Sequence, residues 1–447
     1  MGKLSKTGTI GFFILMVLTV SAIIIDTTII RISVFTGRSE SPLVDVLIFA
    51  ILVILYSIVQ VSMLWWVHSV KKEKTPPYFK LASIIVTIVQ YASIAILILL
   101  VLQIAMNSFY SMILVKTLLS INYLMASILI GLLAHRFFSW YKLKRNFVVV
   151  CFAAAMAVLS LNMLLTLLYV MSELTSQRGD EYVRYSKSLL TVYGNLDSTL
   201  FSAYVSTSVL SFILTWFATA VLMAYYLRRI GRIKYWLVIS LPLIYFLGQF
   251  QTTLLEILAP LRQMNPMIFA ILYTVIFNSS KPIGGVLFGS AFLTVSGRIS
   301  NFDVKQYLIM SGFALLLLFS ANQPINLILL PYPPFGVPTA SFLGLASFMI
   351  LIGIYYSALS VANDSALRRG IRKSIEKHSN LLADIGTAEM ERNIEKRVFR
   401  LTTELSDKIA DETGVSSSME EEEILKYVGT AIKEVKDREG GTSYARG

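Results

Sequence analysis

The segment Asn278–Gly285, with the sequence NSSKPIGG, combines residue types that suit the binding of a polar ligand. It lies inside a run that is otherwise apolar from residue 267 to residue 295. The ammonium of Lys281 and the amide of Asn278 donate hydrogen bonds, and the Asn278 side chain also accepts them. Such groups bind ions and polar solutes by direct contact, so we take this segment as the centre of a candidate site.

The same segment must break the helix that contains it. Pro282 lacks a backbone N–H and its ring disrupts the preceding turn, whereas Gly284 and Gly285 are expected to loosen the turn that follows. Each apolar flank has about 12 residues, or roughly 18 Å of helix, which is too short to cross a bilayer core alone. We therefore expect either one discontinuous crossing or a hairpin that enters and leaves on the same side.

Lys281 requires a compensating group, because an ammonium at this depth is costly and usually faces a partner or water. Asp26 and Glu256 are acidic residues in other apolar segments that are able to supply the opposite charge, and a bound anion is the third choice. A structural kink without a ligand, or a lysine that reaches the membrane surface, are the alternatives. The candidate intramembrane polar site comprises Asn278, Lys281, Pro282, Gly284, Gly285, Asp26 and Glu256.

The chain offers little for catalysis or metal binding. It has no Walker loop, no HExxH, no GxSxG and no dinucleotide-binding fingerprint. His68 and His135 close two apolar segments, but no further ligand accompanies them, so we interpret both as interfacial polar groups. His378 lacks the acidic and Pro-Leu residues that follow a kinase phosphoacceptor histidine. We predict no enzymatic activity, no cofactor and no metal site.

The elements that position these residues are apolar segments. The chain of 447 residues is 55% hydrophobic and 15% charged, against roughly 25% charged in an ordinary soluble domain. Its mean hydropathy is +0.68. Segments of about 20 apolar residues, long enough to span a bilayer, recur along it. The ten predicted spans lie near Ile10–Ile30, Leu43–Val67, Leu81–Ala105, Met112–Leu133, Val148–Met171, Leu200–Tyr226, Trp236–Ile257, Met267–Val295, Tyr307–Leu327 and Ala340–Leu359. The sequence thus predicts an all-α polytopic membrane helix bundle of about ten transmembrane helices.

Charge sets the predicted orientation. The net charge of +12 suggests a nucleic-acid partner only until its distribution is considered: sixteen Lys and Arg residues fall in one alternating set of loops and five in the other. By the positive-inside rule the first set is cytoplasmic, which places both termini in the cytoplasm of a cell-membrane protein without a nucleic-acid partner. A hairpin at Asn278–Gly285 would leave nine crossings and put Arg368 and Arg369 outside, so one interrupted crossing is favoured.

Further polar residues occur within the predicted spans, and we expect most of them to form hydrogen bonds between helices. Asp26 and Arg31 are five residues apart and therefore do not share a helix face. On the outer side, the loop Ser172–Ser198 is expected to be a plain connection that carries a short interfacial helix, and a sensor lip or a lid is the alternative. The remaining polar residues of the spans are Gln60, Gln90, Gln103, Lys116, Asn122, Asn162, Gln249, Gln251 and Asn322.

A composition shift near residue 362 divides the chain into a transmembrane helical domain, 1–361, and a cytoplasmic helical tail, 362–447. Apolar residues at helical spacing predict one tail helix before Gly386 and a second after it, capped by Thr387. Ser418 is expected to start a third. The stripes need a partner, which is supplied by an antiparallel bundle, by the inner face of the membrane domain, or by self-association or a docked protein.

The junction Ser360–Val398, SVANDSALRRGIRKSIEKHSNLLADIGTAEMERNIEKRV, resembles that between the last span and the tail in uncharacterised multi-pass membrane proteins of ammonia-oxidising and related archaea. The resemblance rests on the IGTAEME core and on the basic cluster before it. It covers under a tenth of the chain. It implies an archaeal cell-membrane location and no activity.

Two functions are compatible with this pattern. The first is a non-enzymatic membrane receptor or scaffold that passes a signal to its cytoplasmic helical tail or docks a partner there. The second is a secondary transporter or permease with a polar cavity beside the broken eighth span. Transport is not supported by internal symmetry, because the third span, which corresponds to the eighth in a five-plus-five division, contains neither Gly nor Pro.

Overall fold

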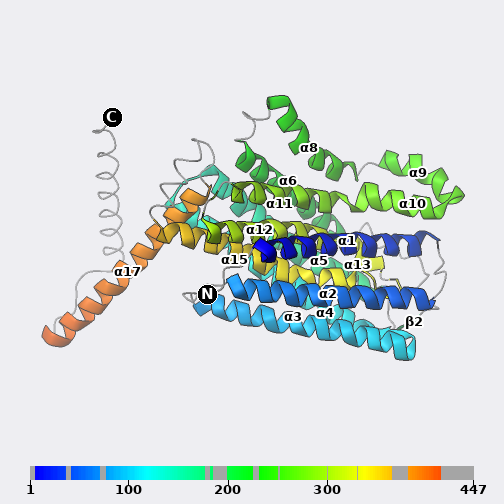
Figure 1. Cartoon of the computed structure of the whole chain (residues 1–447), viewed down its shortest axis with the longest axis horizontal. Coiled ribbons are helices and arrows are strands. Elements are labelled where there is room, and N and C mark those ends of the chain that lie inside the picture. The colour runs from blue at the N-terminus through cyan, green and yellow to red at the C-terminus, as the bar shows by residue number, and fades with distance from the viewer. Residues whose placement is uncertain are drawn as a thin grey trace.

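The computed structural model of the chain is a bundle of long helices with a further helix at one end (Figure 1). It describes residues 6–36, 42–70, 77–176, 182–184, 199–224, 231–249, 252–297, 299, 301–329, 331–364 and 381–413. Apart from two strands of three residues each, the regular elements of this described part are helical. The predicted all-α helix bundle is confirmed.

Most helices of the bundle run in alternating directions along one axis (Figure 1). The first six are α1 (Lys6–Thr36), α2 (Pro42–Val70), α3 (Pro77–Asn107), α4 (Met112–Leu143), α5 (Phe147–Ser176) and α6 (Thr199–Met223). The next are α8 (Arg232–Gly248), α9 (Thr252–Met264), α10 (Pro266–Tyr273), the π-helical turn η2 (Thr274–Asn278), α11 (Ser280–Ser296) and α12 (Phe302–Ala321). The last are α13 (Pro324–Leu329), α14 (Val337–Ala340), α15 (Phe342–Asn363) and α17 (Leu381–Thr413).

Eight helical segments of the described part are long and apolar enough to cross a membrane, and the bent pair of α10–η2 with α11 raises the number to nine. The predicted seventh span, Trp236–Ile257, is absent from this set because it is divided between α8, of 17 residues, and α9. Pro242 lies inside α8 and Pro260 inside α9. The count of ten crossings therefore stays a prediction.

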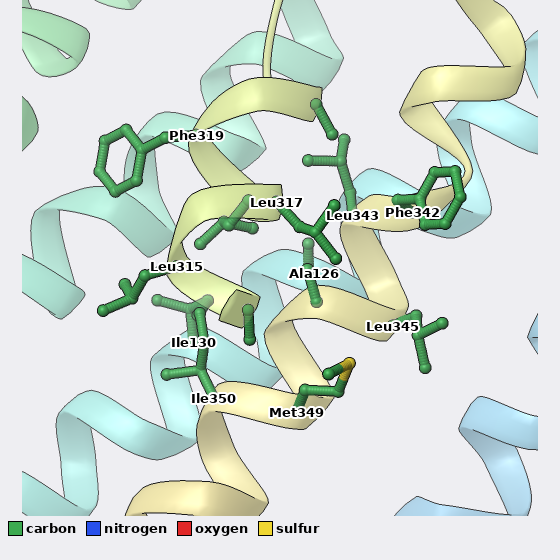
Figure 2. Packing of buried hydrophobic residues seen from close by; sticks show 14 of the residues in the cluster. Ala126, Ile130, Leu315, Leu317, Phe319, Phe342, Leu343, Leu345, Met349 and Ile350 are labelled. Carbon is green, nitrogen blue, oxygen red and sulfur yellow. The ribbon is translucent and has the colours of Figure 1, made fainter. Parts of the chain in front are cut away.

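Helix α15 forms the centre of the bundle. Its span is buried on all sides, and it packs against α12 and α4. Figure 2 shows Leu343 of α15 and Leu317 of α12 meeting near Ala126 of α4. In a bilayer this contact is stabilised by close van der Waals packing and not by removal from water, because lipid tails are as apolar as leucine. Among the described residues, every side chain from Phe342 to Ala358 of α15 is buried, which makes this helix the axis around which the others are arranged.

The peripheral helices have the opposite character. On α2 and α3, Leu43 is 82% exposed, Ile54 59% and Ile88 62%. A soluble protein rarely exposes so continuous an apolar surface, whereas a lipid bilayer requires it. Together with the lengths of the helices, this surface defines a multi-pass membrane protein whose environment is a lipid bilayer.

Polar residues inside the spans join neighbouring helices, as predicted. The Gln60 amide donates to the hydroxyl of Ser341, which directly precedes α15. Asn122 Nδ2 donates to Ser93 Oγ at 2.9 Å, and Asn162 Nδ2 donates to the Tyr204 carbonyl at 3.2 Å. In a hydrocarbon environment each such bond is worth about 0.6 kcal/mol on average. Their value here is mainly that they fix which helix faces meet.

In the loop Ser172–Ser198, for which a short helix is predicted, the residues described beyond α5 form a strand. Residues Tyr182–Arg184 form strand β2, which pairs in antiparallel register with β1 (Phe109–Ser111) beside the start of α4. Most of the rest of this loop, 177–181 and 185–198, lies outside the described residues. Val and Tyr favour a strand wherever a partner edge is present, and β1 supplies that edge.

The tail differs from its prediction at Gly386. Helix α17 runs through this residue without a break, and Thr387 donates its hydroxyl to the Ala383 carbonyl inside the helix instead of capping a new one. A Cβ at Gly386 would lie 2.4 Å from Val361 of α15, so the glycine permits close packing of the two helices. Residues 365–380 and 414–447, which include His378 and the helix predicted from Ser418, lie outside the described residues.

The first part of α17 is docked on the membrane domain. Leu381, Leu382 and Ile385 are buried, and the Trp140 indole N–H of α4 donates to Glu389 Oε2 at 2.8 Å. Tyr355 of α15 donates to the other carboxylate oxygen at 3.5 Å. The later turns project away from the bundle (Figure 1). We refer to the end of the bundle that carries α17 as the tail end.

Candidate functional site

The predicted interruption near Asn278–Gly285 is present. The helix α10 passes into the π-helical turn η2, breaks at Ser279 and resumes as α11, with a bend of 40°. Pro282 lies in the first turn of α11 and cannot donate to the carbonyl four residues earlier, and the preceding turn widens accordingly, with the Ser279 N–H bonded to the Thr274 carbonyl at 3.1 Å. A bend of this size keeps both halves running along the bundle, which agrees with a single interrupted crossing.

The expected loosening at Gly284 and Gly285 is not found. Both residues are buried inside regular helix, and their lack of a side chain serves packing: a Cβ at Gly284 would lie 2.3 Å from the Phe212 ring of α6. A Cβ at Gly285 would lie 3.0 Å from Phe319 of α12. Small residues allow helices in membranes to approach closely, so these glycines hold α11 against α6 and α12.

Arg31 of α1 lies against this break. Its Nη2 atom donates to Oδ1 of Asn278 and to Oδ1 of Asn326, each at 3.2 Å, and its guanidinium carbon lies 5.0 Å from the centre of the Tyr273 ring. Asn326 belongs to α13, which follows a second interruption of the chain between α12 and α13. Arg31 is 4% exposed, so it joins both interruptions from inside the bundle.

Lys281, in the first turn of α11, connects the same two interruptions. Its Nζ atom donates to the Asn322 carbonyl at 3.3 Å and to the Tyr204 hydroxyl at 3.4 Å, and it lies 5.5 Å from the centre of the Tyr204 ring. Asn322 follows the last residue of α12, where helical bonding has ended and a carbonyl is free to accept. The partners of Lys281 are thus neutral oxygens and an aromatic face.

Further polar groups extend the cluster toward α4 and α5. Asn322 donates its amide to Asn162 Oδ1 at 3.5 Å and accepts from the Tyr123 hydroxyl at 3.4 Å. About 22 Å of helix separates Lys281 from the end of α11 at the tail end, so the cluster is well inside the bundle. We call Arg31, Lys281, Asn278, Asn322 and Asn326, with Asn162, Tyr123 and Tyr204, the polar cluster.

Asp26 does not pair with Lys281. Its carboxylate accepts the Gly336 N–H at 3.1 Å with both oxygens and the Thr339 hydroxyl at 2.6 Å. Gly336 has a φ of +86°, a conformation that favours glycine, and it precedes α14 in the buried Pro-rich segment between α13 and α15. Backbone N–H and C=O groups of irregular segments inside a membrane protein need hydrogen-bond partners from the protein. Asp26 is the partner of the Gly336 N–H. Asp26 is thereby separated from the candidate site.

Glu256 lies in α9, and its side chain is outside the described residues. The Nδ1 atom of His68 lies 2.7 Å from the carbonyl oxygen of Leu64 in its own helix. Within the described ranges, no group of three or more His, Cys, Asp or Glu residues is placed to hold a metal ion.

The structure brings Asn278 and Lys281 of the predicted site together, keeps Pro282 as the cause of the break, and assigns Asp26, Gly284 and Gly285 to packing and backbone satisfaction. Sequence reasoning missed Tyr204, Tyr123 and Asn326. Asn326 follows Pro324 after an apolar helix, and this interruption was a usable signal. The two tyrosines had none, because aromatic residues are common in apolar spans.

No family model, curated protein or solved structure matches the chain. The fold and the exposed apolar surface define its class, a multi-pass membrane protein of helical type.

Proposed function

We propose that the protein is a secondary transporter that binds a polar solute at the polar cluster. The observation that carries the proposal is the meeting of two interrupted helices, α10–α11 and α12–α13, at Arg31 and Lys281 inside the bundle. Discontinuous helices place free backbone groups and helix ends where a solute needs them, and this arrangement recurs in secondary transporters. Binding and release require no covalent chemistry.

The orientation in this proposal follows the loop charges. Both termini and α17 face the cytoplasm, the polar cluster lies beyond the middle of the bundle as seen from that side, and the host membrane is the cell membrane. A transporter must expose its site to each side in turn. A receptor exposes it to one side only.

Side-specific thiol labelling tests this difference. In a Cys151→Ala background, Asn278→Cys places one thiol of similar size in the polar cluster, and Ala291→Cys places one in the buried part of α11 as the matched control. A transporter predicts that a membrane-impermeant methanethiosulfonate reagent labels Asn278→Cys both in intact cells and in inside-out vesicles, while Ala291→Cys stays unlabelled in both. Labelling of Asn278→Cys from one side only, or from neither, would reject transport.

A receptor or scaffold is the second candidate, and helix α4 is the specific observation that favours it. Tyr123 of α4 bonds to Asn322 in the polar cluster, and Trp140 of the same helix bonds to Glu389 of α17. The two contacts are separated by about 25 Å of continuous helix. A rigid element with one end at a candidate site and the other at the tail is suited to transmit a change of state.

Hydrogen–deuterium exchange of the full chain in lipid nanodiscs tests this candidate. A Tyr123→Phe variant removes the hydroxyl from the polar cluster without changing the tail contact. If α4 couples the polar cluster to the tail, the amides of residues 381–390 exchange at an altered rate in this variant. Unchanged exchange there would reject the receptor hypothesis. Ser127→Ala, on the same helix but bonded to Ser160 of α5, is the control and leaves the tail amides unchanged in either case.

A further inference from the structure

The polar cluster holds two cationic side chains, Arg31 and Lys281. Neither Arg31 nor Lys281 forms an ion pair with a carboxylate among the side chains that the structure describes. Asp26 is committed to Gly336 and Thr339. Cations within membrane spans are costly and are normally paired with acidic groups or placed against water.

The two cations lie at the same two interruptions of the chain. Arg31 bonds to the side chain of Asn326 and Lys281 to the carbonyl of Asn322, four residues earlier in the same interruption. Arg31 also bonds to Asn278, three residues before Lys281 in the other interruption. The positive end of the helix dipole of α11, at Ser280, adds to the field at this point.

One donor in this cluster has no acceptor. Arg31 Nε is fully buried and makes no hydrogen bond within the described part of the chain, although Nη2 of the same guanidinium bonds twice. A buried donor without an acceptor is costly, and a guanidinium N–H forms a short, strong hydrogen bond with an anionic oxygen. The free position therefore matches an oxyanion.

We propose that the ligand of the polar cluster is an anion with oxygen acceptors, held by Arg31, Lys281 and the amino end of α11. This inference rests on the proposed function and specifies its substrate class. Arg31 supplies one free directional donor at Nε, Lys281 supplies a second positive charge, and the asparagines orient both. A cationic or uncharged solute would leave the two charges unbalanced.

Thermal unfolding of the full chain in lipid nanodiscs tests the proposal, with a fluorogenic dye that reacts with the buried thiol of Cys151 as it becomes exposed. The probes are acetate, succinate, sulfate and phosphate, each compared with chloride at constant ionic strength and pH. Acetate and succinate represent carboxylates, whereas sulfate and phosphate represent inorganic oxyanions. A ligand that binds only the folded state raises the midpoint in a saturable, concentration-dependent way.

The expected result is a saturable rise with at least one oxyanion, lost in Arg31→Gln and in Lys281→Met. Lys116→Met is the matched control and keeps the response, because this lysine bonds to Thr175 at the exposed end of α4. The proposal is overturned if no probe gives a saturable rise, or if the two variants respond as the unchanged protein does. A third outcome also overturns it: the oxyanions raise the midpoint of Glu256→Gln but not that of the unchanged protein. In that case Glu256 supplies the counter-charge of the polar cluster.

The thiol-labelling experiment tests transport and the unfolding experiment tests the anion site, so the two can fail independently. If Asn278→Cys is labelled from both sides but no oxyanion raises the midpoint, the transport proposal stands and the oxyanion proposal is rejected. An oxyanion response with one-sided labelling retains the anion site and removes transport.

Discussion

Removal of the Asp26 carboxylate should destabilise the membrane domain without touching the polar cluster. In the native structure the carboxylate accepts from the Gly336 N–H and from the Thr339 hydroxyl at a position that is 1% exposed. In Asp26→Ala both donors lose this acceptor. Thr339 is able to turn to the Tyr56 hydroxyl, which lies 3.3 Å away, but the Gly336 N–H has no replacement in the described contacts.

The expected loss follows from these contacts. A hydrogen bond to a charged group contributes about 1.5–3 kcal/mol, and a buried donor left unpaired costs about 1–3 kcal/mol. The carboxylate itself was costly to bury, and its removal offsets part of this loss. We therefore expect about 2–4 kcal/mol for Asp26→Ala. Asp26→Asn retains one acceptor oxygen for Gly336, so its loss should be about half as large.

The assay is thermal unfolding in nanodiscs, again reported by the thiol of Cys151, which is the single cysteine of the chain. The midpoint should fall in the order wild type, Asp26→Asn, Asp26→Ala. Asp45→Ala is the control: Asp45 lies in the first turn of α2, where a carboxylate contributes about 0.3–1 kcal/mol through the helix dipole. If Asp26→Ala unfolds at the same midpoint as Asp45→Ala, Asp26 does not hold the segment before α15.

Three further predictions concern helix packing, the tail and the orientation. Gly289→Ala places a Cβ 2.4 Å from a backbone carbonyl oxygen of α12 and should cost about 1–3 kcal/mol, whereas Gly248→Ala meets nothing within 4 Å and should leave the unfolding midpoint unchanged. Trp140→Phe removes the indole donor to Glu389 and should reduce the exchange protection of the α17 amides about tenfold, while Arg400→Ala breaks only an exposed pair and should not; equal protection in both variants would mean that the indole does not hold the tail. Green fluorescent protein fused to the carboxyl terminus should be fluorescent, and alkaline phosphatase fused there should be inactive, because both termini are proposed to be cytoplasmic. The reverse pattern would show that the carboxyl terminus lies outside.

The membrane class and the interrupted helix were predictable because both are local properties. A run of apolar residues is long enough to span a bilayer wherever it occurs, and a proline inside it removes a donor whatever its neighbours are. The break before Pro282 therefore followed from the chain alone. The division of the predicted seventh span into α8 and α9 did not, because its apolar run is nearly continuous.

Glycine shows where local rules end. Gly386 was expected to end a helix, yet α17 continues through it because Val361 of α15 lies against that face. Gly284 and Gly285 were expected to loosen α11 and instead admit α6 and α12 to close contact. A missing side chain has several uses, and the neighbouring helix decides among them.

The sequence by itself determined that this chain crosses a membrane many times, that one crossing is broken beside a lysine, and that loop charges favour cytoplasmic termini. Only the tertiary structure decided which polar groups meet: Asp26 with Gly336, and Arg31 with Asn278 and Asn326, from segments some 250–310 residues apart. The physical reason is that a buried polar group must be satisfied within the protein, while the choice of partner depends on which helix faces pack together.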